Sequence, residues 1–207
     1  MKLIIHTFKL FTRKVFTTAH GSANYRHSLV LELIEDGKTG YGEATEILYY
    51  GKYINKMIAL VQKHKAWIES LDLLPPSIQY QRWNERFGED KFVLCAIDMA
   101  YHDLWGKLKG KKLVDLWGLD IRHNPLSSLT VGIDTIPNMV KHIDENPWPL
   151  YKIKLGTSYD MEIMKSIKAH TDKPLKVDAN GGWNADLAIE YSKILFDLGI
   201  EYIEQPL

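Results

Sequence analysis

The sequence predicts an α/β protein in which a small α+β region, residues 1–123, precedes a region of alternating strands and helices, residues 124–207. Three observations lead to this prediction. A β-hairpin pattern opens the chain, three helical patterns follow it, and after Asn124-Pro125 short strands alternate with helices. Such alternation is typical of a parallel sheet, either an open α/β sheet or a barrel.

In the first region, residues 1–10 alternate weakly and are expected to form a strand. Residues 17–27 are polar and contain glycine, so we expect a loop there. Residues 28–35 alternate between apolar and polar side chains, Asp36-Gly37 supplies turn chemistry, and residues 38–43 complete a hairpin. Apolar residues at helical spacing then predict three helices, over residues 52–71, 78–87 and 91–108.

In the second region, the predicted strands cover residues 126–133, 150–155, 175–178 and 200–204. A helix begins near Pro137, because proline suits the first turn of a helix. Further helices are expected over residues 161–170 and 185–198. Asn184 is placed to cap the last of these helices and Gly199 to end it.

The composition excludes several classes of protein. Lys+Arg and Asp+Glu balance at 26 each, so neither nucleic acid nor an acidic membrane surface is expected as a partner. The apolar run at the N-terminus is too short for a secretory signal, and no segment has the roughly 20 apolar residues of a membrane span. The single Cys95 rules out an internal disulfide and, among apolar neighbours, is expected in the core. We therefore expect a cytoplasmic globular protein.

Two lysines, Lys152 and Lys154, lie two residues apart in one predicted strand. Side chains alternate faces along a strand, so both lysines must point the same way. Two neighbouring ammonium groups repel each other, and burial adds a desolvation penalty, so both effects favour the neutral amine. A neutral lysine is a usable base near neutral pH, although an isolated K-x-K is more often a solvated strand face.

Four polar residues occur late in successive predicted strands: Thr130, Lys154, Asp178 and Glu204. Their separations of 24, 24 and 26 residues place them at corresponding points of successive β/α units. In a barrel, the carboxyl ends of the strands are where catalytic groups gather. Buried carboxylates beside lysines are satisfied either by ion pairing alone or by a hard divalent cation.

The chain resembles the enolase superfamily, and within it the muconate-lactonizing subgroup. The motifs that carry the resemblance are Lys152-Ile153-Lys154, Lys176-Val177-Asp178-Ala179-Asn180, Ile203-Glu204-Gln205-Pro206 and the stretch from Ala96 to Lys107. The resemblance implies an enolase-type capping domain over residues 1–123 and the first half of a TIM-like (β/α) barrel over residues 124–207. It also implies that Asp178 and Glu204 are ligands of Mg²⁺, and that Lys154, assisted by Lys152, moves a proton α to a carboxylate.

Within the subgroup, two stretches resemble dipeptide epimerases of the L-Ala-D/L-Glu type. Thr130-Val131-Gly132-Ile133-Asp134 resembles their first barrel strand, and Ala19-His20-Gly21-Ser22 resembles their specificity loop. The resemblance implies that Thr130, Lys152 and His20 contact a small-molecule substrate, a dipeptide. His20 stands where glutamate-selective members can carry an arginine, so a preference for glutamate does not follow.

The sequence reaches Leu207 one residue beyond the Glu-Gln-Pro motif, so only four of the eight barrel strands are expected. We interpret the 207 residues as part of a longer chain that forms a homo-oligomer, and we expect no turnover from them alone. The leading hypothesis is a Mg²⁺-dependent epimerase of dipeptides that acts by 1,1-proton transfer through an enolate. Muconate cycloisomerase or o-succinylbenzoate synthase chemistry on the same site is one alternative, and a non-catalytic fragment or binding scaffold is another.

Overall fold

The computed structural model describes the backbone of residues 1–207 and every side chain except that of Lys14. The chain divides into two compact units. One contains residues 1–11 and 25–123, and the other contains residues 12–24 and 124–207. Each unit has its own hydrophobic core, and the core of the second unit lies beneath the strands that carry the polar residues of the site.

A three-stranded sheet in the order β1-β2-β3 contains the strands β1 (Lys2–Thr18), β2 (Gly21–Glu35) and β3 (Lys38–Thr45). Residues 12–24, where β1 and β2 meet at their turn, belong to the second unit. Strands β2 and β3 are antiparallel, and their register runs from Ser28 opposite Thr45 to Glu35 opposite Lys38. The turn between them is Asp36-Gly37, where both residues have positive φ, as the tight turns of hairpins require. The predicted hairpin is confirmed.

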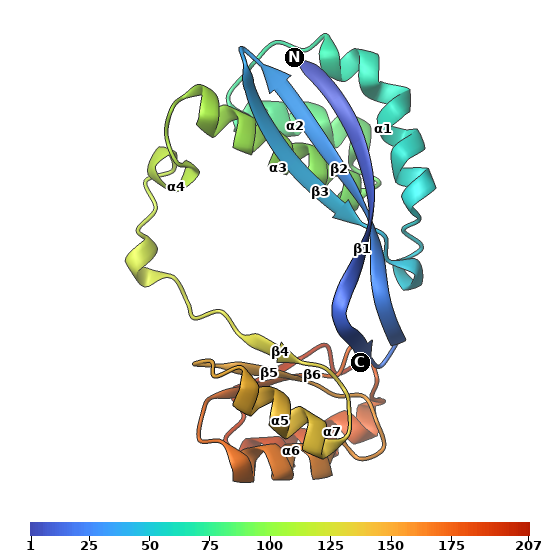
Figure 1. The fold of residues 1–207 in the computed structure, drawn as a ribbon, viewed down its shortest axis with the longest axis vertical. Coiled ribbons are helices and arrows are strands. Elements are labelled where there is room, and N and C mark those ends of the chain that lie inside the picture. The colour runs from blue at the N-terminus through green and yellow to red at the C-terminus, as the bar shows by residue number, and fades with distance from the viewer. The chain divides into compact units, whose positions relative to one another are not determined.

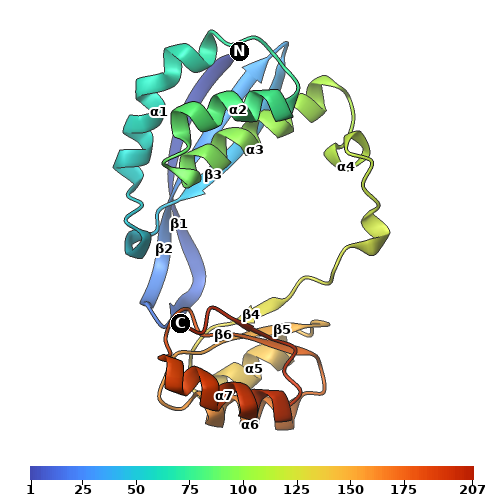
Figure 2. The ribbon, with the colours of Figure 1, turned by 180° about the vertical axis from the view of Figure 1, so that it is seen from behind.

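Helices α1 (Ile54–Glu69), α2 (Pro76–Phe87), α3 (Lys91–Leu108) and α4 (Leu113–Leu116) follow the sheet. Short 3-10 turns cover Leu48–Tyr50 and Ile121–His123. Helices α2 and α3 lie against one face of the sheet, as both views show (Figures 1 and 2). Glycine on β3 permits this packing, because a Cβ on Gly40 or Gly42 would overlap the backbone of α3.

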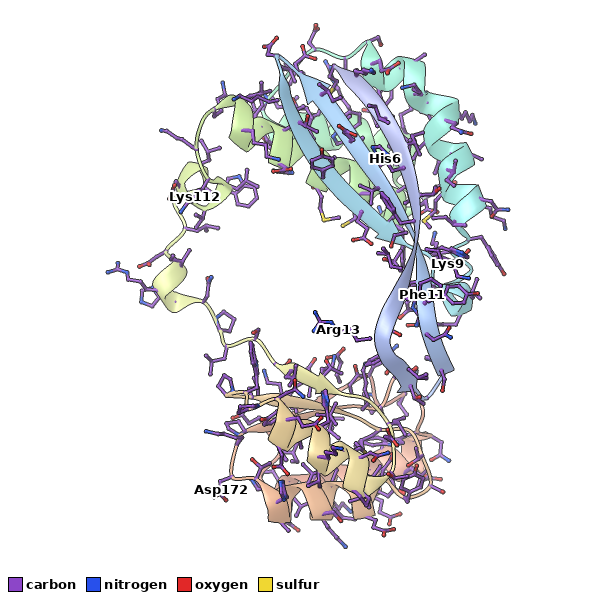
Figure 3. The ribbon with its side chains drawn as sticks, in the orientation of Figure 1. His6, Lys9, Phe11, Arg13, Lys112 and Asp172 are labelled. Atoms are coloured by element: carbon purple, nitrogen blue, oxygen red, sulfur yellow. The ribbon has the colours of Figure 1, made fainter. Side chains whose placement is uncertain are left out.

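Two predictions about the first half of the chain are wrong. Residues 17–27 are not a loop, because β1 extends to Thr18 and β2 begins at Gly21, which leaves only Ala19-His20 as the turn. Strand hydrogen bonds need no apolar side chains, and exposed aromatic residues support the hairpin. Lys9 lies over the ring of Phe11, at 5.3 Å from its centroid (Figure 3). It also lies 4.1 Å from the centroid of the Tyr25 ring.

Cys95 is exposed rather than part of the core. It lies on α3 between Leu94 and Ala96, which are both buried. The apolar stripe of α3 continues through Ile97 and Ala100, and a helical period of 3.6 residues turns position 95 away from that stripe.

The second unit is built from alternating strands and helices. These are β4 (Leu129–Val131), α5 (Ile136–Glu145), β5 (Tyr151–Lys154), α6 (Asp160–His170), β6 (Leu175–Asp178), α7 (Ala185–Asp197) and β7 (Tyr202–Glu204). The strands are parallel and lie in the order β4-β5-β6-β7. Helices α5, α6 and α7 cover one face of this sheet in both views (Figures 1 and 2). The predicted α/β fold with a parallel sheet is confirmed.

Alternation decides which side chains of the parallel strands meet the helices. Ile153 and Val177 are fully buried in the core beneath the sheet. Their neighbours Lys152, Lys154 and Asp178 therefore point to the opposite face. Asn184 caps α7 as predicted, because its side chain accepts a hydrogen bond from the amide of Leu187.

Among the helices that the structure describes, none combines the length and hydrophobicity that crossing a bilayer would require.

Candidate active site

Three polar side chains meet at the carboxyl ends of neighbouring strands. Lys154 on β5 is the register partner of Asp178 on β6, and Asp178 is in turn the register partner of Glu204 on β7. Register partners in a parallel sheet present their side chains on the same face, so the predicted row of one lysine and two carboxylates is present in the structure.

Both lysines of the K-x-K motif contact the same carboxylate oxygen. The Nζ atom of Lys154 lies 2.7 Å from Oδ2 of Asp178, and Nζ of Lys152 lies 2.8 Å from that oxygen. Lys152 Nζ also lies 2.8 Å from Oε2 of Glu204, so one ammonium group joins the two carboxylates. Asp178 is 1% exposed, and burial strengthens these charge-assisted hydrogen bonds.

The electrostatics differ from those expected for two neighbouring lysines. Burial favours the neutral amine of Lys152, but the hydrogen bonds to Asp178 and Glu204 outweigh this effect and raise the pKa of Lys152. Burial would also raise the pKa of Asp178, yet hydrogen bonds from Lys152, Lys154 and the amide of Asn180 hold it below its ordinary value. The expectation that the lysine pair favours the neutral amine is therefore wrong for Lys152, because the carboxylates offset the repulsion.

Asn180 is a site residue to which the sequence analysis gave no role. Its Oδ1 atom accepts a hydrogen bond of 2.9 Å from Nζ of Lys154, and its own amide donates to Oδ1 of Asp178. The residue has a φ of 49°, a left-handed conformation that asparagine tolerates better than most residues. The signal available in the sequence was its place two residues after Asp178, where the backbone turns out of the strand.

Thr130 lies two residues closer to the amino ends of the strands than its predicted alignment with Lys154 requires. Its register partner is Lys152 rather than Lys154, and the position level with Lys154 on β4 is Gly132. The separation of 24 residues hid this shift because the connections between strands differ in length. Thr130 is half-buried and lines a cavity of about 450 Å³ together with Phe16 and Gly132.

The turn that carries His20 lies at the same end of the sheet. Its neighbour Ala19 approaches the loops after β5 and β6 so closely that a Cβ on Gly156 would come within 2.6 Å of the Ala19 Cβ. The amide of Ile133, in the segment after β4, donates to the carbonyl oxygen of Thr17. The His20 side chain is exposed at this turn.

The carboxylates fit two ligands of a hard cation, because both reach a single cationic group, the ammonium of Lys152. Among the residues whose side chains the structure describes, no three His, Cys, Asp or Glu side chains cluster closely enough to hold a metal ion. At this point the structure offers two carboxylate donors, Asp178 and Glu204.

Comparison with known proteins places this arrangement in a family. A family profile described as "Enolase C-terminal domain-like" matches residues 138–207, the segment that carries Lys152, Lys154, Asp178 and Glu204. All 207 residues align with the L-Ala-D/L-amino acid epimerase of Flavobacterium johnsoniae at 39% identity. Along its whole length, the chain is similar to proteins of the enolase superfamily. It spans about 62% of the length of that relative.

Solved structures share the fold of this chain. The chain superimposes on a substrate-liganded L-Ala-D/L-Glu epimerase from Bacillus subtilis with a TM-score of 0.90 and 22% identity, covering 100% of this chain and 62% of that one. It also superimposes on a dipeptide epimerase from Enterococcus faecalis, complexed with Mg and the dipeptide L-Leu-L-Tyr, with a TM-score of 0.86. The identity to that protein is 25%, and the match covers 100% of this chain and 60% of that one.

Proposed function

We propose that the protein containing these residues is a Mg²⁺-dependent epimerase of dipeptides, which moves a proton at the α-carbon of the C-terminal residue. The observation that carries the proposal is the register of Lys154, Asp178 and Glu204 on three successive strands. It is supported by the 39% identical relative from Flavobacterium johnsoniae, which is named an epimerase of L-Ala-D/L-amino acids. An ion-pair network serving only stability would not account for both.

Lys154 is the proposed base. Its neutral amine accepts the α-proton at Nζ, and the electron pair of the C–H bond moves into an enolate. A proton returned from the opposite face by a second acid, which the superfamily resemblance gives as an opposing lysine, completes the epimerisation. Asn180 accepts a hydrogen bond from Nζ of Lys154 and so orients the amine.

Asp178 and Glu204 would hold Mg²⁺, which when bound supplies a divalent charge against the negative charge that develops on the substrate carboxylate. Lys152 stays protonated beside these groups, because its two carboxylate partners raise its pKa. Its ammonium group would bind the substrate carboxylate and keep it close to Lys154. The α-proton is then acidified where the base can reach it.

Thr130 and His20 are the proposed contacts to the rest of the dipeptide. Thr130 lies on the same face of the sheet as Lys152, its register partner. His20 lies at the hairpin turn, where the adjacent Ala19 contacts the loops after β5 and β6. An imidazole is a smaller and less basic group than a guanidinium, so it suits second residues other than glutamate.

Deuterium incorporation tests the proposal directly. The intact protein containing this chain is incubated with Mg²⁺ and a library of L,L-dipeptides in D₂O, and the α-carbon of the C-terminal residue is followed by NMR and mass spectrometry. We expect exchange and conversion to the L,D-epimer for at least one dipeptide. No exchange across the library would rule the proposal out. Conversion of a muconate or an o-succinylbenzoate precursor instead would assign the site to a lyase.

A further inference from the structure

Asp160 is a fully buried carboxylate that the proposed chemistry does not use. It lies in the first turn of α6 and is 0% exposed. Its Oδ1 atom accepts hydrogen bonds from the amide and the hydroxyl of Thr157, at 2.8 and 2.6 Å. Its Oδ2 atom accepts from the amide of Gly156 and from the indole Nε1 of Trp183, at 2.8 and 2.7 Å. Four donors offset the cost of removing the carboxylate from water.

These bonds join two loops that carry the site. Gly156 and Thr157 follow Lys154 on the loop after β5, whereas Trp183 lies on the loop after β6, the strand that ends at Asp178. The Trp183 bond therefore links the loop after the proposed base to the loop after the proposed metal ligand, in addition to the bond from the Leu155 amide to the carbonyl oxygen of Asp178. The indole ring is 6% exposed and packs edge-on against Tyr191, so its orientation is fixed.

The backbones of the two loops also approach each other closely. A Cβ on Gly182 would come within 2.8 Å of the Cα of Gly156 and within 2.9 Å of the carbonyl oxygen of Ala179. The loop after β6 is in turn bonded to the segment after β7, because the amide of Trp183 donates to the carbonyl oxygen of Pro206. A shift of either loop therefore changes the position of the other.

We propose that Asp160 and Trp183 are positioning residues, which tie the loop after β5 to the loop after β6 and so hold Lys154 in register with Asp178. This inference rests on the proposed function. Lys154 ends its strand only two residues before Gly156, so the bond from the Gly156 amide to Asp160 fixes the backbone beside the base. Proton transfer depends steeply on the placement of the reacting groups, and an error of about 1 Å can cost a hundredfold in rate.

The test replaces Trp183 by phenylalanine, which keeps an aromatic ring in the core and removes the Nε1–H donor. Trp148→Phe is the control for loss of an indole donor, because the Nε1 of this exposed tryptophan also donates a hydrogen bond of 2.7 Å, to the carbonyl oxygen of Ser127 and away from the two loops. In the intact protein with Mg²⁺, we expect Trp183→Phe to lower kcat for α-proton exchange about tenfold, with KM for the dipeptide within about twofold. Trp148→Phe leaves both constants unchanged.

A second readout does not depend on activity. Amide hydrogen exchange of Gly156 and Thr157, measured by NMR, should become faster in Trp183→Phe and stay unchanged in Trp148→Phe. If wild-type protein exchanges no dipeptide, the proposed function fails, and the amide measurement still reports whether the two loops are tied. Protection of both amides equal to wild type overturns the inference. So does a kcat that is unchanged, or that falls only in proportion to the fraction of folded protein.

Discussion

Asp178 and Glu204 are register partners on β6 and β7, and their carboxylates share one cation. The Nζ atom of Lys152 lies 2.8 Å from each of them. Two carboxylates on adjacent parallel strands would repel each other without such a group. Asp178 is almost fully buried while the Glu204 side chain is 41% exposed, so the two partners should respond differently to substitution.

Replacing Lys154 by alanine should slow α-proton exchange severely, because no other amine is bonded to both Asp178 and Asn180 in the described part of the chain. We expect kcat to fall about a thousandfold, within the range measured for the loss of a general base. Lys165→Ala, an exposed lysine on α6, is the control and should retain full activity. Exchange rates in D₂O measure both variants, and residual exchange within tenfold of wild type in Lys154→Ala would remove this lysine from the mechanism.

Replacing Glu204 by glutamine should weaken Mg²⁺ binding with little effect on stability. The amide lacks the charge that a hard cation prefers, and the position is exposed enough for the altered group to be hydrated. Isothermal titration calorimetry should give an affinity at least tenfold lower than that of wild type. Glu201→Gln, an exposed carboxylate three residues earlier, should bind Mg²⁺ as wild type does. Equal affinities in all three proteins would contradict a metal role for Glu204.

The row of Lys154, Asp178 and Glu204 could be predicted from the sequence, because it depends only on the alternation of side chains along strands and on the β/α repeat. It was not sufficient for Thr130, since a change of two residues in one connection moves a whole strand's register without altering its pattern. The roles of Asn180 and Asp160 depend on loop conformations, such as the φ of 113° at Gly156, that no periodicity encodes. Continuation of the hairpin past residue 17 was missed because its exposed strands carry polar side chains.

Replacing Gly42 by alanine should destabilise the first unit. The new Cβ would overlap the carbonyl oxygen of Ala96 and lie 2.6 Å from the amide nitrogen of Ala100, and both are backbone atoms that move only if α3 moves. We expect a loss of about 3 kcal/mol in the free energy of unfolding, at the upper end for overpacked cores. Gly132→Ala serves as the comparison, because its nearest atoms lie at an ordinary 3.5 Å. Urea denaturation measures the free energy of unfolding of both variants. A Gly42→Ala protein as stable as Gly132→Ala would show that α3 shifts to accommodate the new methyl group.

Glu46 should make the stability of the first unit depend on pH. Its Oε1 atom accepts a hydrogen bond of 2.9 Å from the amide of Ile54 at the start of α1, and its Oε2 atom lies 3.0 Å from Nδ1 of His27. The Ile54 bond is the main cause of a lowered pKa at Glu46. Burial opposes it, and His27 adds to it.

A carboxyl whose pKa is lower in the folded than in the unfolded protein stabilises the fold above its unfolded value of about 4.3. That contribution is lost as the pH falls through the lower folded value. Glu46→Gln should therefore be less stable than wild type by about 1 kcal/mol at pH 7, because its amide oxygen accepts the Ile54 bond without the charge that strengthens it. The difference should shrink as the pH is lowered below about 4.

Urea denaturation between pH 3 and pH 7 measures this difference, with Glu85→Gln as the control because Glu85 is exposed on α2. The free energy of unfolding of Glu85→Gln should equal that of wild type at every pH. A gap between Glu46→Gln and wild type that persists unchanged at pH 3 would mean that the shape of the glutamate side chain, rather than its charge, stabilises the start of α1.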